Sequence, residues 1–177
     1  MQFCALLDGF GEGMTRVSNL LAPGADLVAS QMNRLGDHLR LYLEDGRQGH
    51  LMDLRYAGGH DFSPTLLLKV IGRKTGRPQV VPLLYGLYGN EVIVVGSKGG
   101  HPDHPAWYLN LVAGEDITIQ IVEDCFRASW RVLDGQEYKK VWDYMAGIYP
   151  PYAEYQEATE RRIPLVALKR TEIVAKL

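Results

Sequence analysis

The chain has 177 residues, of which 46% are hydrophobic and 23% are charged, and its formal net charge is −2 at pH 7. This length and composition favour one globular domain, with at most a small appendage, and exclude a disordered or collagen-like chain. The nearly balanced charge argues against a nucleic-acid partner, and the apolar runs are too short for a transmembrane helix.

The first 62 residues are expected to hold one helix between two irregular segments. Residues 1–24 are Gly-rich and weakly patterned, which predicts a flexible leader; its glycines lack the spacing and βαβ context of a dinucleotide-binding loop. From Ala25 to Glu44 apolar residues recur at alternating steps of four and three, which indicates an amphipathic helix. Arg47–Ser63 is expected to form a crossing loop, so that residues 25–62 contain the helix and this loop.

From residue 63 to residue 177 the pattern changes to short strands with hairpin-length links. This order predicts an α+β fold in which a mainly antiparallel sheet of six strands closes as a barrel, with helices packed outside. Strands are expected at Leu66–Ile71, Val80–Tyr88, Glu91–Gly96, Ile117–Val122, Cys125–Leu133 and Ile163–Lys169. Helices are expected at Pro105–Ala113, Gln136–Ile148 and Tyr152–Arg161.

The two cysteines, Cys4 and Cys125, lie far apart, and neither belongs to a CxxC motif. We therefore expect neither a disulfide framework nor a zinc site. The N-terminus lacks the features of an export signal, so we expect a cytoplasmic protein.

Positive charge is concentrated between Phe62 and Pro102, where five basic residues accompany one acidic residue. Such an island is a reason to look for an anionic ligand. It contains the turn Gly72–Pro78, in which glycines free the backbone amides, Arg73, Lys74 and Arg77 supply charge, and Thr75 supplies a hydroxyl. The alternative is a hairpin tip that is charged for solubility.

A second Gly-rich basic turn, Ser97-Lys98-Gly99-Gly100, follows a strand that should lie beside the first two. We expect its lysine to converge with the first turn on one phosphate group. The alternative is again a plain turn.

The segment from His101 to Tyr108 contains two further candidates. His101 and His104 have metal-ligand spacing with an Asp between them, but prolines break the helix that would align them, and no third ligand is evident. We therefore predict no metal site. Trp107 either packs in the core or stacks on a cofactor ring.

Half of the ten tyrosines fall within residues 138–155. A phenol at a pocket mouth can donate a proton or a hydrogen bond to a group that is being reduced. The residues alone favour the alternative, which is packing between helix and barrel. These tyrosines are Tyr138, Tyr144, Tyr149, Tyr152 and Tyr155.

The sequence contains no nucleophile elbow, paired catalytic carboxylates or zinc cluster. Hydrolytic and metal-dependent reactions therefore lose support, and a cofactor-dependent reaction is favoured.

Four segments together resemble the deazaflavin-dependent nitroreductase family: LLLKVIGRKTGRPQVVPLLYG, VGSKGGHPDHPAWYLNLVA, ITIQIVEDCFRASWRV and YPPYAEYQEATERRIPLVAL. In that family the patterns T-G-R-K-T/S-G, S-x-G-G, P-x-W-Y-x-N-L and Y-P-x-Y-x-x-Y-Q-x-x-T-x-R-x-I-P occur in this order and spacing. The resemblance covers Thr65 to Leu168, with weaker likeness in the preceding helix and in Glu44–Arg55.

The resemblance implies a split β-barrel of the FMN-binding type that binds coenzyme F-420, an 8-hydroxy-5-deazaflavin with an anionic phosphate and polyglutamate tail. By matching position, the coenzyme would be bound by Arg73, Lys74, Thr75, Gly76, Arg77, Ser97, Lys98, Gly99, Gly100 and Trp107. The substrate-side tyrosines would be Tyr149, Tyr152 and Tyr155, with Tyr152 as the proton donor or the residue that orients the substrate. Two departures from the family pattern concern the anion site: Gln79 stands where many members have a basic residue, and Lys69-Val70-Ile71 replaces a Thr-rich run.

The leading hypothesis is an oxidoreductase that transfers a hydride between reduced F-420 and a small organic acceptor, which would be a quinone, an enone or a nitro compound. Two alternatives stay open: an FMN-dependent oxidoreductase on the same barrel, and a non-catalytic protein that carries a coenzyme or a fatty-acyl ligand. The helix Ala25–Glu44 would cover the pocket, pack at a homodimer interface or rest weakly on a membrane surface.

Overall fold

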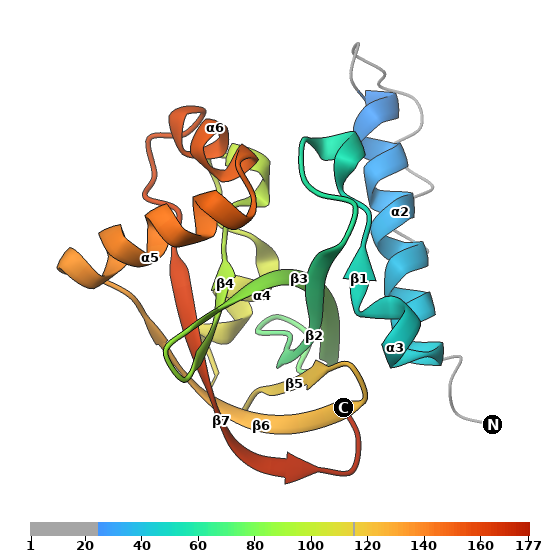
Figure 1. Ribbon diagram of the computed structural model, residues 1–177. Helices are drawn as coiled ribbons and strands as arrows, with labels where there is room; N and C mark the ends of the chain where they lie inside the picture. The colour runs from blue at the N-terminus through green and yellow to red at the C-terminus, as the bar shows by residue number, and fades with distance from the viewer. Residues whose placement is uncertain (1–24, 115) are drawn as a thin grey trace. The chain divides into compact units, whose positions relative to one another are not determined.

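The computed structural model describes residues 25–114 and 116–177 (Figure 1). Residues 38–177 form one compact unit. The leader expected over residues 1–24 lies outside the described residues. The predicted N-terminal helix is present as α2, Ala25–Glu44, and its last turns, from His38 on, belong to the compact unit.

A closed antiparallel barrel is the centre of the unit. The sheet has the strand order β1-β2-β3-β4-β7-β6-β5, and an additional pairing of β2 with β5 closes strands β2 to β7 into a six-stranded barrel. The predicted fold class is confirmed. The strands are β1 Leu51–Met52, β2 Ser63–Ile71, β3 Pro78–Tyr88, β4 Glu91–Val95, β5 Thr118–Ile121, β6 Asp124–Val132 and β7 Leu165–Val174.

Strand β2 is apolar along most of its length because both of its faces are buried. Leu66, Leu68 and Val70 belong to the main core cluster, together with residues of β4, β5 and β7. Leu67 points the other way and packs with Leu39 and Tyr42 of α2. Successive side chains of a strand point to opposite faces, so the run of leucines fills the barrel and also attaches the end of α2 to it.

The helices α4 Ala106–Leu111, α5 Gly135–Ile148 and α6 Pro151–Glu157 complete the unit. Val141 and Met145 of α5 pack with Ile93 of β4 and with Leu165 of β7, in a second apolar cluster. Figure 1 shows α5 and α6 next to each other, beside β4 and β7.

The segment predicted as a crossing loop contains short regular elements: α3 Gly46–Gly49, β1 and the 3₁₀ helix η2 Arg55–Ala57. The Asp45 carboxylate caps α3 by accepting from the amides of Arg47 and Gln48. Strand β1 pairs with only the first two residues of β2. Elements this short carry no hydrophobic period that a sequence pattern could reveal.

The predicted boundaries that differ most from the structure are those at the ends of α6 and β7. Helix α6 ends at Glu157 rather than at Arg161, and β7 continues to Val174 rather than ending at Lys169. The extra residues of β7 are mostly polar and exposed, and they are ordered by pairing with β6. In the described part of the chain, no helix is both long enough and apolar enough to span a lipid bilayer.

Candidate functional site

The first basic turn, Gly72–Arg77, links β2 to β3. The Gly72 amide donates to Arg77 O at 2.8 Å, and the Gly76 amide donates to Gly72 O at 2.7 Å. Gly76 has φ +65°, a left-handed conformation that glycine adopts without strain. Among the hydrogen bonds of the described residues, the Lys74 amide donates none, so it stands available to an anion.

Asn110 of α4 anchors this turn from inside. Its Oδ1 accepts from the Arg73 amide at 3.2 Å and from Arg73 Nη1 at 2.9 Å, and its Nδ2 donates to Gln79 Oε1 at 2.7 Å. Asn110 is only 4% exposed. Gln79, which stands where many family members have a basic residue, therefore takes part in the hydrogen bonds that hold this turn.

The second basic turn contains the 3₁₀ helix η3, Lys98–Gly100. Ser97 is right-handed, whereas Lys98, Gly99 and Gly100 have φ values of 49°, 61° and 77°. A right-handed residue followed by a left-handed one turns successive amides toward a common point, the geometry of an anion-binding nest. Among the described residues, the amides of Lys98 and Gly99 have no acceptor.

The second turn lies directly against the helix that carries the tyrosines. A Cβ placed on Gly100 would be 2.8 Å from Tyr155 O and 3.0 Å from Ala158 Cβ. Only glycine therefore fits between this turn and α6, and the contact places the predicted anion site next to the predicted substrate side.

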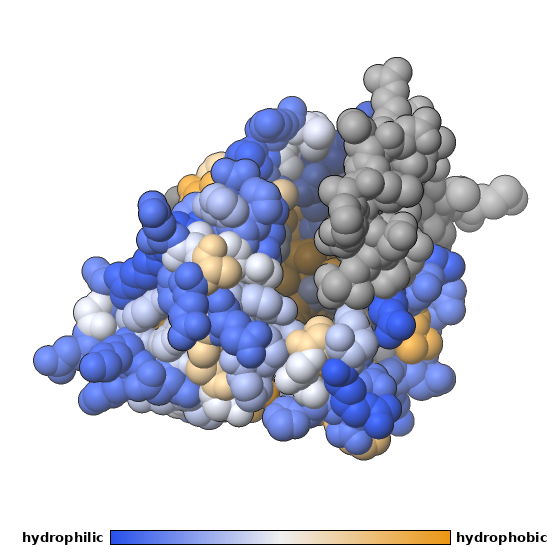
Figure 2. All heavy atoms as spheres, turned by 90° about the horizontal axis from the view of Figure 1, so that it is seen from above, coloured by the Kyte–Doolittle hydropathy of each residue, from blue (hydrophilic) through white to orange (hydrophobic). Residues whose placement is uncertain are grey.

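The three predicted tyrosines form one cluster. The ring centroids of Tyr149 and Tyr152 are 4.9 Å apart, and that of Tyr155 is 6.3 and 6.4 Å from these two. The Tyr149 hydroxyl donates to Ala57 O at 3.0 Å and lies 3.3 Å from the Tyr155 hydroxyl. Seen from above in Figure 2, the described residues present mostly hydrophilic side chains, with hydrophobic residues exposed in a few small areas.

The hydroxyls of Tyr152 and Tyr149 differ in their hydrogen bonding. Tyr152 is only 5% exposed, yet its hydroxyl, unlike that of Tyr149, has no hydrogen-bond partner among the described residues. Since no fully buried side-chain oxygen or nitrogen of these residues lacks a partner, at least part of the Tyr152 hydroxyl is accessible to a bound molecule. Burial raises the pKa of both phenols above the ordinary value of 10, so both keep their protons at neutral pH.

Trp107 occupies the position of a core residue. It is 8% exposed and packs in the main cluster with residues such as Leu66 and Leu111. Its neighbour Tyr108 is less buried and lies 4.9 Å, between ring centroids, from His104.

The two histidines have separate partners. His101 Nδ1 accepts from the Asp103 amide at 3.0 Å, whereas His104 Nδ1 lies 3.3 Å from Arg161 Nη1. Burial, and then the Arg161 charge, lower the pKa of His104. A guanidinium at this distance opposes a bound cation, and the described residues hold no cluster of three or more metal-ligand side chains.

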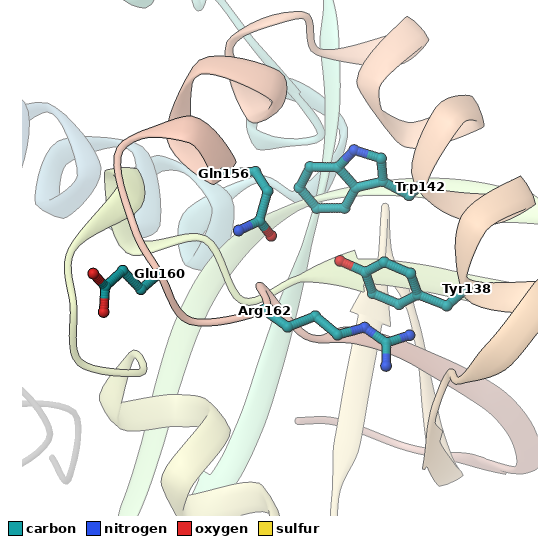
Figure 3. Close-up of a pocket in the computed structure, with 5 residues that line it drawn as sticks. All are labelled: Tyr138, Trp142, Gln156, Glu160 and Arg162. Atoms are coloured by element: carbon teal, nitrogen blue, oxygen red, sulfur yellow. The ribbon is translucent and has the colours of Figure 1, made fainter.

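A pocket of about 350 Å³ is lined by residues of α5, of α6 and of the segment that follows α6 (Figure 3). The Trp142 ring is 6.4 Å from that of Tyr152, and the Arg162 guanidinium covers the Tyr138 ring at 3.7 Å. Arg162 also forms an ion pair with Asp134, so its positive charge is already balanced within the protein. None of the predicted site residues lines this pocket, whose walls are Tyr138, Trp142, Gln156, Glu160 and Arg162.

Comparisons with known proteins identify the family. Residues 50–170 match the family model described as F420H(2)-dependent quinone reductase. The chain belongs to this family. An F420H(2)-dependent quinone reductase of Mycobacterium tuberculosis is 34% identical over 129 residues, which cover 71% of this chain and 82% of the relative.

Two solved structures are similar to this member of the quinone reductase family. An F420-H2 dependent reductase (FDR-A) is 36% identical with a TM-score of 0.55, and the match covers 60% of this chain and 94% of the other. A structure described as a domain-swapped dimer is 31% identical with a TM-score of 0.58, covering 82% and 98%. The predictions of a split barrel, an oxidoreductase and coenzyme F-420 are confirmed.

The residue assignments within this reductase stay predictions. The structure brings Tyr149, Tyr152 and Tyr155 together and places Gly100 against them. It links the first turn to α4 through Asn110, and it buries Trp107. Sequence reasoning gave no role to Asn110 or Arg161, although each lies within a quoted motif; their signal was a polar side chain on an element that is otherwise apolar or short.

Proposed function

We propose that this chain reduces a quinone-type acceptor with reduced coenzyme F-420, whose anionic part is bound by the turns Gly72–Arg77 and Ser97–Gly100. The observation that carries the proposal is the contact of Gly100 with Tyr155, because it joins an anion-binding turn to the helix that carries Tyr152.

The donor set of the two turns suits a phosphate. The exposed side chains of Lys74 and Lys98 provide charge, and three backbone amides in the turns have no acceptor among the described residues. Hydrogen bonds from amides and ammonium groups to phosphate oxygens are charge-assisted and hence strong. When bound, the reduced deazaflavin supplies the hydride.

Tyr152 supports the other half of the reaction. An acceptor that gains a hydride develops negative charge on its oxygen, which a hydrogen-bond donor stabilises. The raised pKa keeps the Tyr152 phenol protonated, and its hydroxyl is not engaged by another described residue. Tyr149, in contrast, donates to Ala57 O, which favours a role in holding the cluster together.

We also propose that the chain forms a homodimer. Support comes from the similar domain-swapped structure and from α2, where Leu41 and Leu43 are 39% and 47% exposed. Light scattering that gives the mass of one 19.8 kDa chain would contradict a dimer.

The proposed function is tested by titrating the protein with F-420, FMN and FAD side by side. We expect F-420 to bind, and Lys74→Ala combined with Lys98→Ala to weaken that binding by at least about tenfold, because two charges near the phosphate are lost. The melting temperature should change little, since both side chains are exposed.

The matched control is Lys139→Ala with Lys140→Ala, which removes two exposed lysines from α5. This variant should bind F-420 as the wild type does. Unchanged affinity in the Lys74, Lys98 variant would overturn the assignment of the phosphate site, and binding of FMN alone would overturn the choice of coenzyme.

A further inference from the structure

Arg161, between α6 and β7, holds both ends of the second basic turn. Its Nη2 donates to Ser97 O at 2.6 Å and its Nε donates to His101 O at 2.8 Å. One rigid guanidinium thereby bridges the residues that enter and leave the segment Lys98–Gly100. A planar fork of this kind fixes direction as well as distance.

The contact with Ser97 also determines where an amide points. Ser97 C=O and the Lys98 N–H belong to one peptide unit, and in a trans peptide they point in opposite directions. Because Arg161 binds the oxygen, the Lys98 N–H points away from it. A left-handed lysine is uncommon, and Lys98, with φ 49°, lies between the two residues whose carbonyls Arg161 binds.

Arg161 also connects the two basic turns. Its Nη1 lies 3.3 Å from His104 Nδ1, just before α4 begins. At the other end of α4, Asn110 holds Arg73 in the first turn. The side chain is partly buried, and its positive charge lies on the carbonyl side of the second turn, where no phosphate oxygen is expected.

We propose that Arg161 is the positioning residue of the coenzyme site: by binding Ser97 O and His101 O it holds Lys98–Gly100 in the left-handed form that aims the amides of Lys98 and Gly99 at the phosphate of F-420. The inference rests on the proposed function, because that function supplies the anion. The neighbouring Arg162 has a different task, since it covers Tyr138 and pairs with Asp134.

The test compares two ligands: F-420 and the deazaflavin fragment that lacks its phosphate and polyglutamate tail. Dissociation constants are measured by fluorescence for the wild type, Arg161→Met and Arg161→Lys. We expect Arg161→Met to weaken F-420 binding about tenfold and fragment binding less than about twofold, because the fragment lacks the phosphate that the turn is proposed to bind. Arg161→Lys can bind one carbonyl at a time, so its loss should be intermediate.

Arg162→Met is the matched control and should leave both constants unchanged. Equal losses for the two ligands in the Arg161 variants, or no loss, would overturn the positioning role. If Arg161→Met does not fold, Arg161→Lys carries the same comparison. The proposed phosphate site has its own readout: it fails if wild-type protein does not prefer F-420 to the fragment, or if Lys98→Ala leaves that preference intact. A preference that Lys98→Ala reduces and the Arg161 variants do not would overturn the inference about Arg161 alone.

Discussion

The three clustered tyrosines are chemically similar residues in different environments. Tyr149 is engaged with Ala57 O and the Tyr155 hydroxyl, whereas the Tyr152 hydroxyl has no partner among the described residues. A phenol hydroxyl that is not engaged by the protein is available to donate to a bound acceptor. The motif could predict which tyrosines contact one another. It could not predict which hydroxyl has a hydrogen-bond partner, because the acceptor of Tyr149 belongs to η2, a short element that the sequence did not reveal.

We expect Tyr152→Phe to lower kcat about 100-fold, the scale of a lost proton or hydrogen-bond donor, while the dissociation constant of F-420 stays the same. Steady-state turnover of a quinone and a parallel binding titration give the two quantities.

The control for Tyr152 is Tyr149→Phe, which should act on stability. It removes one hydrogen bond to the half-buried carbonyl of Ala57, which is worth about 0.5–1.5 kcal/mol of unfolding free energy. If Tyr152→Phe turns over quinone at the wild-type rate, Tyr152 is a packing residue.

At the scale of elements, the patterned segments were predictable, whereas the very short elements between Arg47 and Ser63 and the polar end of β7 were not. The 20-residue α2 was predicted with its bounds, because its apolar period runs over several turns. Strand β7 was predicted too short, since the exposed residues after Leu168 gain their order from pairing with β6 rather than from their own pattern. Tertiary pairing of this kind leaves no local signal.

The end of α2 is fastened to the barrel by a buried polar network. His38 Nε2 lies 2.9 Å from Thr65 Oγ1, and the Thr65 hydroxyl can donate to Gly49 O or His50 O at 3.2 or 3.1 Å. Because the Thr65 hydroxyl proton is donated to a backbone carbonyl, Thr65 Oγ1 accepts the hydrogen bond from His38 Nε2, and His38 donates as a neutral imidazole. The Tyr42 hydroxyl donates to Thr65 O at 2.9 Å beside it.

This network predicts a pH dependence of stability. Burial lowers the pKa of His38 below its ordinary value of 6.5, so the unfolded chain takes up the proton first. The contribution is complete above pH 6.5 and is lost as the pH falls toward the folded-state pKa. The free energy of unfolding should therefore decrease as the pH falls from about 6.5 toward the folded-state pKa of His38.

His38→Gln keeps a donor for Thr65 but does not titrate, so its unfolding free energy should decrease less over the same range. Because the pKa of His104 is also lowered, the comparison of the variant with the wild type isolates His38. Equal decreases in chemical denaturation would contradict this assignment.

At the scale of the whole molecule, the net charge of −2 conceals the positive region from Phe62 to Pro102. Most of this charge lies in the two turns, with Arg73, Lys74 and Arg77 in the first and Lys98 in the second. Hydrogen bonds of α4 and of Arg161 connect the two turns. The sequence could predict that these basic residues lie in two turns. It could not predict the left-handed conformation of Lys98, because that conformation depends on the guanidinium of Arg161, which is distant in the sequence.

The concentration of basic residues in the two turns predicts how salt affects the binding of F-420. The dissociation constant of F-420 should rise with ionic strength, because the lysines of both turns are exposed and charges in solvent are screened beyond about 10 Å at 0.1 M salt. The tail-free fragment should show a weaker dependence, and the Lys74→Ala, Lys98→Ala variant should bring the slope for F-420 close to that of the fragment. A salt series of fluorescence titrations measures the slopes. If the variant keeps the slope of the wild type, the anionic tail of the coenzyme binds elsewhere on the molecule.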